Sequence, residues 1–316
     1  MEIYKTRASI ASKSNWLLSL IIILLVTFGV MAVLQGIALV LVPPLFGVPL
    51  DEFMAILSGQ STNPNARIAL LFVQGLGAGL GFFFAALLIA KLIDKANLGW
   101  KQQLQRFRFT SLMIMIMVML GGMLFNSLLI DWNSNVHFPE FLSGLEVKMR
   151  AMEDAAMDLT KYITDFDSFP EFLMGVLVIG VCAGLGEEFF FRGVLQPKLH
   201  AYTGNAHVGI WLTAFIFSAI HFQFYGFFPR MLLGAIFGYL YLYSGSLIYP
   251  IVAHILNNTV TVILVYLNKL GKVNFDIEEA DEVSIPLALL GLLILLLGLR
   301  IFKEKNKTQI TNGELD

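Results

Sequence analysis

The chain has 316 residues, of which 57% are hydrophobic and only 14% are charged, and its formal net charge is −2 at pH 7. Its mean hydropathy of +0.74 corresponds to more apolar surface than the core of a soluble protein can bury. This composition excludes an ordinary soluble domain, and no basic patch typical of nucleic-acid binding occurs in the sequence. We therefore expect a polytopic membrane protein.

Apolar stretches recur along the whole chain. A bilayer core of about 30 Å requires about 20 helical residues per crossing. We interpret about eight stretches as membrane spans and predict an all-α protein; the stretches are Trp16–Val42, Ile68–Ile93, Ser111–Ile130, Phe172–Leu195, Val208–Phe224, Met231–Tyr243, Leu247–Leu267 and Ile285–Ile301. The sixth stretch is the shortest.

The segments between the spans alternate in charge. Lys and Arg gather on one side, at Lys5, Arg7, Lys13, Lys91, Lys95, Lys101, Arg106, Arg108, Arg192, Lys198, Lys303, Lys305 and Lys307. The opposite loops are acidic, at Asp51, Glu52, Asp154, Asp158, Asp165, Asp167 and residues Asp276 through Glu282. Since Lys and Arg near span ends mark the cytoplasmic side, both termini are predicted to be cytoplasmic.

Two further segments have patterns that bear on packing. The run GLGAGLG from Gly75 to Gly81 lies in apolar sequence, so we interpret Gly75 with Gly79, and Gly77 with Gly81, as small faces for close helix packing. The segment Phe141–Phe166 mixes apolar and charged residues. It is predicted to be an amphipathic helix, either along the outer membrane surface or as an exposed loop helix.

The fourth span ends in GEEFFFRG, which places three ionisable residues in apolar sequence, where such groups are costly and usually functional. On a helix Glu188 and Arg192 are four residues apart and can pair. Glu187 is rotated by about 100° from Glu188, so the same arginine does not easily serve both carboxylates. Glu187 is therefore left to exchange a proton with water.

The fifth span carries FSAIH, in which Phe217 and His221 share a helical face, so that an aromatic ring shields the imidazole. If the fourth and fifth spans pair as a hairpin about Thr203-Gly204-Asn205, Glu187 and His221 are equally far from the turn. We therefore expect Glu187 and His221 to lie at a similar depth.

The seventh span carries HILNN, in which His254 and Asn258 share one face and Asn257 points elsewhere. Their imidazole and amide groups can act on one point. Counting from the turn near Gly245 predicts that His254 lies nearer the cytoplasm than His221, so tilt or a broken helix must bring them together.

Taken in order, the three motifs resemble those of the CPBP family of membrane proteases, also called the ABI family. Its EExxxR is found as Glu187, Glu188 and Arg192; its FxxxH as Phe217 and His221; and its HxxxN as His254 and Asn258. Three motifs in order are more specific than one. The resemblance implies a helical fold with a buried active-site cavity, as in the type II CAAX prenyl endopeptidase.

The resemblance also implies the roles of these residues. Glu187 is the expected general base, His221 helps to bind or polarise the water, and His254 and Asn258 stabilise the oxyanion. Glu188 and Arg192 are expected to order the site. A metal-free mechanism without cofactors is favoured, although zinc is possible; its ligands would then be Glu187, His221 and His254.

The leading hypothesis is an intramembrane endopeptidase, in a bacterial cell membrane, acting on a membrane-associated or lipid-modified peptide near the cytoplasmic face. Its partners are that substrate and the lipid bilayer, with no nucleic acid. The alternatives are a non-catalytic scaffold or bacteriocin-immunity protein of the same fold, and an ion-coupled transporter.

We divide the chain into N-terminal spans with the amphipathic segment (residues 1–170), a catalytic helical core (171–268), and an outer acidic loop with the last span and basic tail (269–316).

Overall fold

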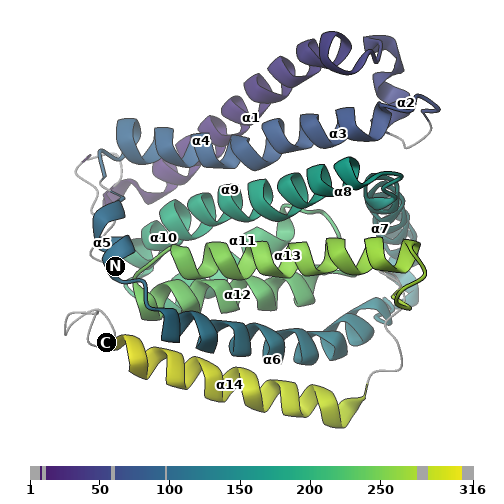
Figure 1. Cartoon of the computed structure of the whole chain (residues 1–316). Coiled ribbons are helices and arrows are strands. Elements are labelled where there is room, and N and C mark those ends of the chain that lie inside the picture. The colour runs from purple at the N-terminus through teal and green to yellow at the C-terminus, as the bar shows by residue number, and fades with distance from the viewer. Residues whose placement is uncertain (1–7, 9–11, 58–60, 97, 276–283, 308–316) are drawn as a thin grey trace.

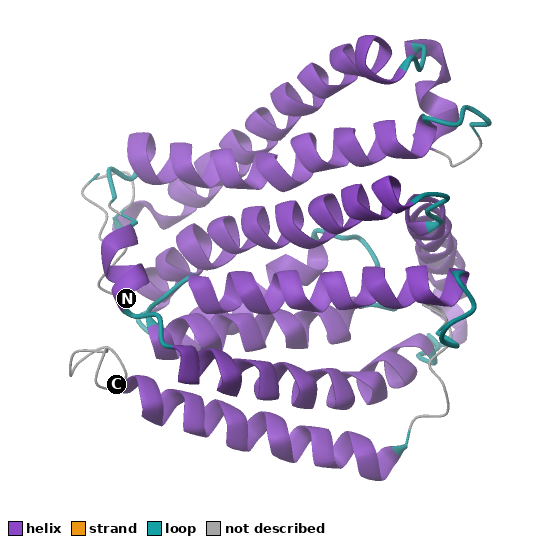
Figure 2. Cartoon of the chain, viewed as in Figure 1, coloured by secondary structure: helices purple, strands orange, loops and turns teal. Residues whose placement is uncertain are grey.

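The computed structural model describes residues 8, 12–57, 61–96, 98–275 and 284–307. Within these residues the regular secondary structure is helical, with no strand (Figure 2). The predicted all-α fold is therefore confirmed. Lys5, Arg7 and the acidic residues 276–282, on which part of the charge argument depends, lie outside the described residues.

Six helical segments in the described part of the chain are long and apolar enough to cross a membrane: Lys13–Phe46, Ala66–Ile93, Phe109–Ser134, Phe169–Thr203, Ile248–Lys269 and Ile285–Asn306. The protein is an integral membrane protein. The helices that build these segments are α1 (Trp16–Phe46), α3 (Ala66–Gln74), α4 (Leu80–Leu88), α6 (Phe109–Ser134), α8 (Phe169–Gly175), α9 (Ala183–Phe190), α10 (Gln196–Thr203), α13 (Ile248–Lys269) and α14 (Ile285–Asn306). The remaining helices are α2 (Phe53–Leu57), α5 (Trp100–Gln105), α7 (Ser143–Thr164), α11 (Ala206–Ala219) and α12 (Phe227–Ser244).

The predicted fifth and sixth spans are also helical, but they are short. Helix α11 has 14 residues and α12 has 18. At 1.5 Å of rise per residue they reach roughly 21 Å and 27 Å, less than a bilayer core of about 30 Å. The fifth helix ends at Ala219 rather than at Phe224, because the chain turns there and Phe222 adopts a positive φ of 54°.

The predicted hairpin between the fourth and fifth segments is confirmed. Gly204 has a φ of 73° and donates its N–H to the carbonyl of His200, which ends α10. The side chain of Asn205 then accepts hydrogen bonds from the amides of His207 and Val208, which caps the start of α11. Helices α10 and α11 pack against each other as a result.

The helices form a stack in which the motif-bearing elements lie in the middle (Figure 1). Helices α1, α3 and α4 cover one side, and α9 packs against both α4 and α13. On the other side α12 packs against α6 and α13, and α14 packs along α6. The motif helices are therefore enclosed by protein on two sides.

Both glycine faces predicted for the second span pack closely against other helices. A Cβ on Gly75 or Gly79 would meet Val178 or Cys182 of the fourth segment. The other face, Gly77 and Gly81, lies against Gln35 and Met31 of α1. Gly186 completes the approach, because a Cβ there would collide with the carbonyl oxygen of Gly79. The missing side chains thus let the helix that carries Glu187 approach the second span closely.

Helix α7 is the predicted amphipathic segment. It lies across one end of the stack in Figure 1. Ile163 and Thr164 at its C-terminal end are buried, whereas Phe141, Leu145 and Val147 near its start are exposed. Contact of this helix with the membrane surface stays a prediction.

Candidate active site

The EExxxR motif forms a fully buried ion pair. Nη1 of Arg192 is 2.5 Å from Oε1 of Glu188, and neither side chain is exposed. Nη2 of Arg192 donates a hydrogen bond of 2.7 Å to the carbonyl of Gly234, and the guanidinium lies over the rings of Phe217 and Phe237. The predicted pair is confirmed, and Arg192 joins it to α12.

Glu188 has a second partner that the sequence did not predict. Its Oε1 lies 2.8 Å from Nδ1 of His254 on α13. The imidazole stacks on Phe237, with ring centroids 4.9 Å apart. A carboxylate at Nδ1 holds the proton on that nitrogen, so Nε2 of His254 is left for other partners.

Glu187 lies on the other face of the helix, as its rotation predicted. Its side chain is 16% exposed, and its Oε2 is 3.9 Å from Nε2 of His254. It lines a cavity of about 710 Å³ together with His221, His254 and Asn258. A smaller cavity of about 390 Å³ is also lined by Glu187, His221 and Asn258. The structure therefore brings together all four residues that we expected to be catalytic.

His221 occupies the turn after α11 and is not on the helix itself, which corrects the predicted helical position. Its Nδ1 still lies 2.8 Å from the carbonyl oxygen of Phe217, and the two rings pack edge to face at 5.5 Å. Because Nδ1 donates to this carbonyl, Nε2 of the neutral ring is an acceptor. Phe217 also packs against His254, so one ring shields both imidazoles.

Asn258 lies at the cavity as predicted, but so does Asn257, which was expected to point elsewhere. Nδ2 of Asn258 donates a 3.0 Å hydrogen bond to the carbonyl of Ile179, which lies in the π-helical segment Val176–Cys182. Asn257 donates to Oδ1 of Asn258 at 3.2 Å. One N–H of the Asn258 amide is left for other contacts.

Three polar residues of the cavity wall were missed. Oε1 of Glu153 on α7 accepts a hydrogen bond from Gln223, and its Oε2 accepts one from the backbone N–H of Tyr225. Gln223 in turn accepts from Arg230 at 2.9 Å. Burial raises the pKa of Glu153. Gln223 and Arg230 interrupt an apolar sequence and could have been noticed, but nothing local links Glu153 to them.

Glu187, His221 and His254 are also the predicted ligands of the zinc alternative. Within the described residues, no group of three or more His, Cys, Asp or Glu side chains is arranged to hold a metal ion. Glu187, His221 and His254 line the same cavity, but in the described part of the chain they do not form such a group.

Comparisons with known proteins point to the same part of the chain. An uncharacterized Bacillus subtilis protein, YpbD, is 29% identical over 106 residues, which are 32% of this chain and 49% of that relative. The match thus spans about half of the relative's length. No solved structure matches the chain with significance. Residues 169–260 match the family described as type II CAAX prenyl endopeptidase Rce1-like. This segment contains all three motifs, so the part of the chain that carries the candidate catalytic residues is the part that is similar to this family.

Proposed function

We propose that the protein is an intramembrane endopeptidase that hydrolyses a peptide bond of a membrane-associated or lipidated peptide. The Rce1-like domain supports a CAAX-type protease. The observation that carries the mechanism is the position of Glu187, which lines both cavities and faces Nε2 of His254 at 3.9 Å. A carboxylate between a cavity and a histidine is suited to take a proton from water.

In the proposed reaction Glu187 is the general base. The water oxygen attacks the peptide carbonyl carbon, and the water proton passes to Glu187. His221 accepts a hydrogen bond from the same water at Nε2 and so orients it. The C–N bond of the tetrahedral intermediate then breaks, and the proton held by Glu187 passes to the leaving amine. No metal or cofactor takes part in this proposal.

The oxyanion of the intermediate is stabilised by His254 and Asn258. Protonated His254 donates from Nε2, while its Nδ1–H stays on the carboxylate of Glu188. Asn258 contributes the amide N–H that does not bind Ile179. Glu188, Arg192 and Phe217 act as positioning residues, since each contacts a group of the site and is itself buried.

We also propose that the membrane is a bacterial cell membrane and that both termini face the cytoplasm. The relative from Bacillus subtilis supports the first statement. The basic residues around Lys101, Arg106 and Lys303, all described in the structure, support the second.

A cleavage assay tests this function. Purified protein in lipid is incubated with a library of membrane-tethered peptides, beside Glu187→Gln and beside Asp154→Asn, a matched change on another carboxylate of the same cavity. We expect cleavage by the wild type and Asp154→Asn but not by Glu187→Gln, with no effect of a zinc chelator. Loss of activity with the chelator and its recovery with zinc would favour the metal mechanism. Binding of a peptide without cleavage would favour the non-catalytic scaffold or immunity protein.

A further inference from the structure

The two ends of the helical stack differ in their Lys and Arg content. One end of the stack in Figure 1 holds α5, the start of α6 and the C-terminal end of α14, and is here called the basic end. The segments that meet there carry Lys13, Lys91, Lys95, Lys101, Arg106, Arg108, Lys198, Arg300, Lys303, Lys305 and Lys307. The opposite end holds α2, α7 and the C-terminal end of α13, and is here called the acidic end. The segments that meet there carry fewer described cations, namely Arg67, Lys148, Arg150, Lys161, Lys269 and Lys272. Ion pairs with acids occur at both ends: Arg67, Arg150 and Lys269 are paired at the acidic end, and Lys198 and Arg300 are paired at the basic end.

Contacts between distant segments establish which residues share each end. At the basic end Arg108 donates to the carbonyl of Lys305, and Arg106 donates to the carbonyl of Gly245. At the acidic end Arg67 and Lys269 both bind Asp167 at 2.8 Å. The ends are therefore surfaces of the folded protein and not merely alternating loops.

Both cavities lead from the candidate catalytic residues towards the acidic end. Helix α7 lines the larger one with Glu153, Asp154 and Met157, and the C-terminal part of α6 lines it with Ser134. Thr160 of α7 lines both cavities. None of the residues that line these two cavities belongs to the basic end as defined above.

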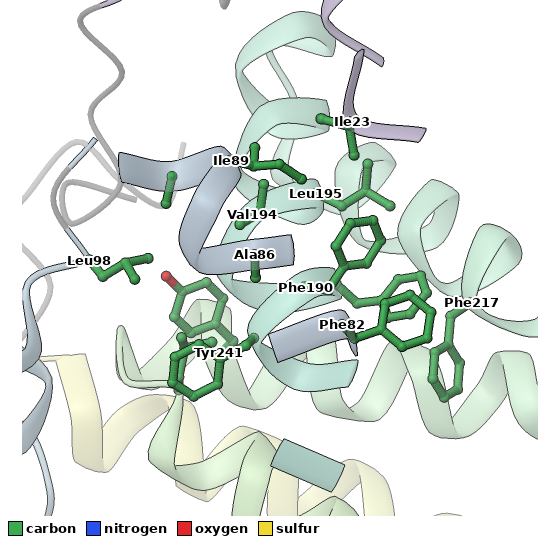
Figure 3. Close-up of a cluster of buried hydrophobic side chains, with 14 of the residues drawn as sticks. Ile23, Phe82, Ala86, Ile89, Leu98, Phe190, Val194, Leu195, Phe217 and Tyr241 are labelled. Atoms are coloured by element: carbon green, nitrogen blue, oxygen red, sulfur yellow. The ribbon is translucent and has the colours of Figure 1, made fainter. Parts of the chain in front are cut away.

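Towards the basic end the site is closed by an apolar cluster (Figure 3). After Glu187 the chain continues through Phe190, Val194 and Leu195, which are buried. Phe82 and Ile89 of the second span pack into the same cluster. A peptide would have to displace this close-packed core to reach Glu187 from the basic end.

From these observations we infer that the substrate enters from the acidic end, which the distribution of Lys and Arg places outside the cytoplasm. On the proposed function, the substrate is therefore the extracytoplasmic segment of a membrane-associated peptide. Cleavage would then take place on the outer side and not, as the sequence suggested, near the cytoplasmic face. Helix α7 lies at the entrance, where Glu153 joins it to the turn that carries Gln223 and Tyr225.

Cysteine labelling tests the direction of entry without requiring cleavage. Cys182 is first changed to alanine, and Thr160→Cys is introduced in the cavity wall. Met157→Cys is a second cavity variant in case the first does not fold, and Ser14→Cys at the basic end is the matched small-side-chain control. Intact spheroplasts and permeabilised ones are treated with a membrane-impermeant maleimide.

We expect the cavity cysteines to be labelled in intact spheroplasts and Ser14→Cys only after permeabilisation. Labelling of a folded cavity variant only after permeabilisation, or not at all while Ser14→Cys reacts, would overturn the inference.

In a second experiment the same peptide is tethered on either side of the membrane. Cleavage of the outer peptide alone is expected, and cleavage of the inner one alone would refute the inference but leave the protease function intact. Cleavage of neither would refute the protease function, while the labelling still decides the direction of access.

Discussion

The basic and acidic ends of the molecule are built in different ways. At the basic end Lys198 and Asp94 form an ion pair of 2.7 Å whose side chains are 1% and 0% exposed, and Ser19 of α1 is also bound. At the acidic end Asp165 and Asp167 are 59% and 69% exposed, although both pair with Lys269. Between the site and the basic end lies a buried apolar cluster, whereas the two cavities are lined by residues of the acidic end such as Thr160. The candidate active site lies between the two ends.

The largest loss of stability is expected in the candidate active site, which lies between the two ends. Arg192→Ala leaves Glu188 buried without its cation and removes the bond to Gly234. Loss of one partner of a fully buried pair costs roughly 5 kcal/mol of unfolding free energy. Thermal unfolding in lipid measures this effect. Glu187→Ala, which removes a carboxylate facing the cavity, is the control and is expected to keep near wild-type stability. Equal losses for the two variants would contradict separate roles for the two carboxylates.

A smaller loss is expected from the basic end. Lys198→Met keeps much of the side-chain volume but removes the cation beside Asp94. We expect a loss of about 3 kcal/mol, because Asp94 lies at the end of a helix, where water can reach it after a small opening. The double variant Lys198→Met with Asp94→Asn should recover part of this loss. A double variant less stable than Lys198→Met alone would show that the charge pair is not the cause.

The smallest effect is expected at the acidic end and depends on pH. Hydrogen bonds from the Phe138 amide and Arg150 lower the pKa of Glu146 to about 2, and Lys269 and Arg67 lower the pKa of Asp167 to about 2. Because the folded pKa values are lowered, the stabilisation is complete above the ordinary values of 4.5 and 3.8 and is lost as the pH falls towards 2. The protection of backbone amides against hydrogen exchange, taken relative to the intrinsic exchange rate at each pH, should therefore fall more in α7 than in α10 on acidification.

The control for this effect is Glu146→Gln, which cannot change its charge. This variant should exchange faster in α7 at neutral pH and should respond less to acid than the wild type. An unchanged acid response in Glu146→Gln would place its origin in other groups.

Local sequence was sufficient to predict contacts between side chains that lie within one or two helical turns of each other. The pairing of Glu188 with Arg192 and the contact of Phe217 with His221 follow from a spacing of four residues. The two glycine faces of the second span were predicted for the same reason. The position of His221 was less well predicted, because the helix ends at Ala219 and its ending depends on the turn that follows.

Contacts between residues of different helices could not be predicted from their spacing in the sequence. The depth count placed His254 nearer the cytoplasm than His221, yet both line one cavity. The fourth segment contains two π-helical segments, Val176–Cys182 and Phe191–Leu195, on either side of α9. Each changes the rotation and rise of the helix, so a count of residues at 1.5 Å per residue does not give the relative depth of distant groups.

The amino-acid sequence by itself determined the all-helical membrane fold, the unequal charge of its two ends and the three motifs, because hydrophobicity and helical spacing are local properties. Only the tertiary structure decided that Glu188 binds His254 as well as Arg192, and that Glu153 reaches the turn of Gln223. It also decided that the cavity leads to the acidic end. These features depend on how separate helices cross, which is set by close packing at sites such as Gly79 and Gly186.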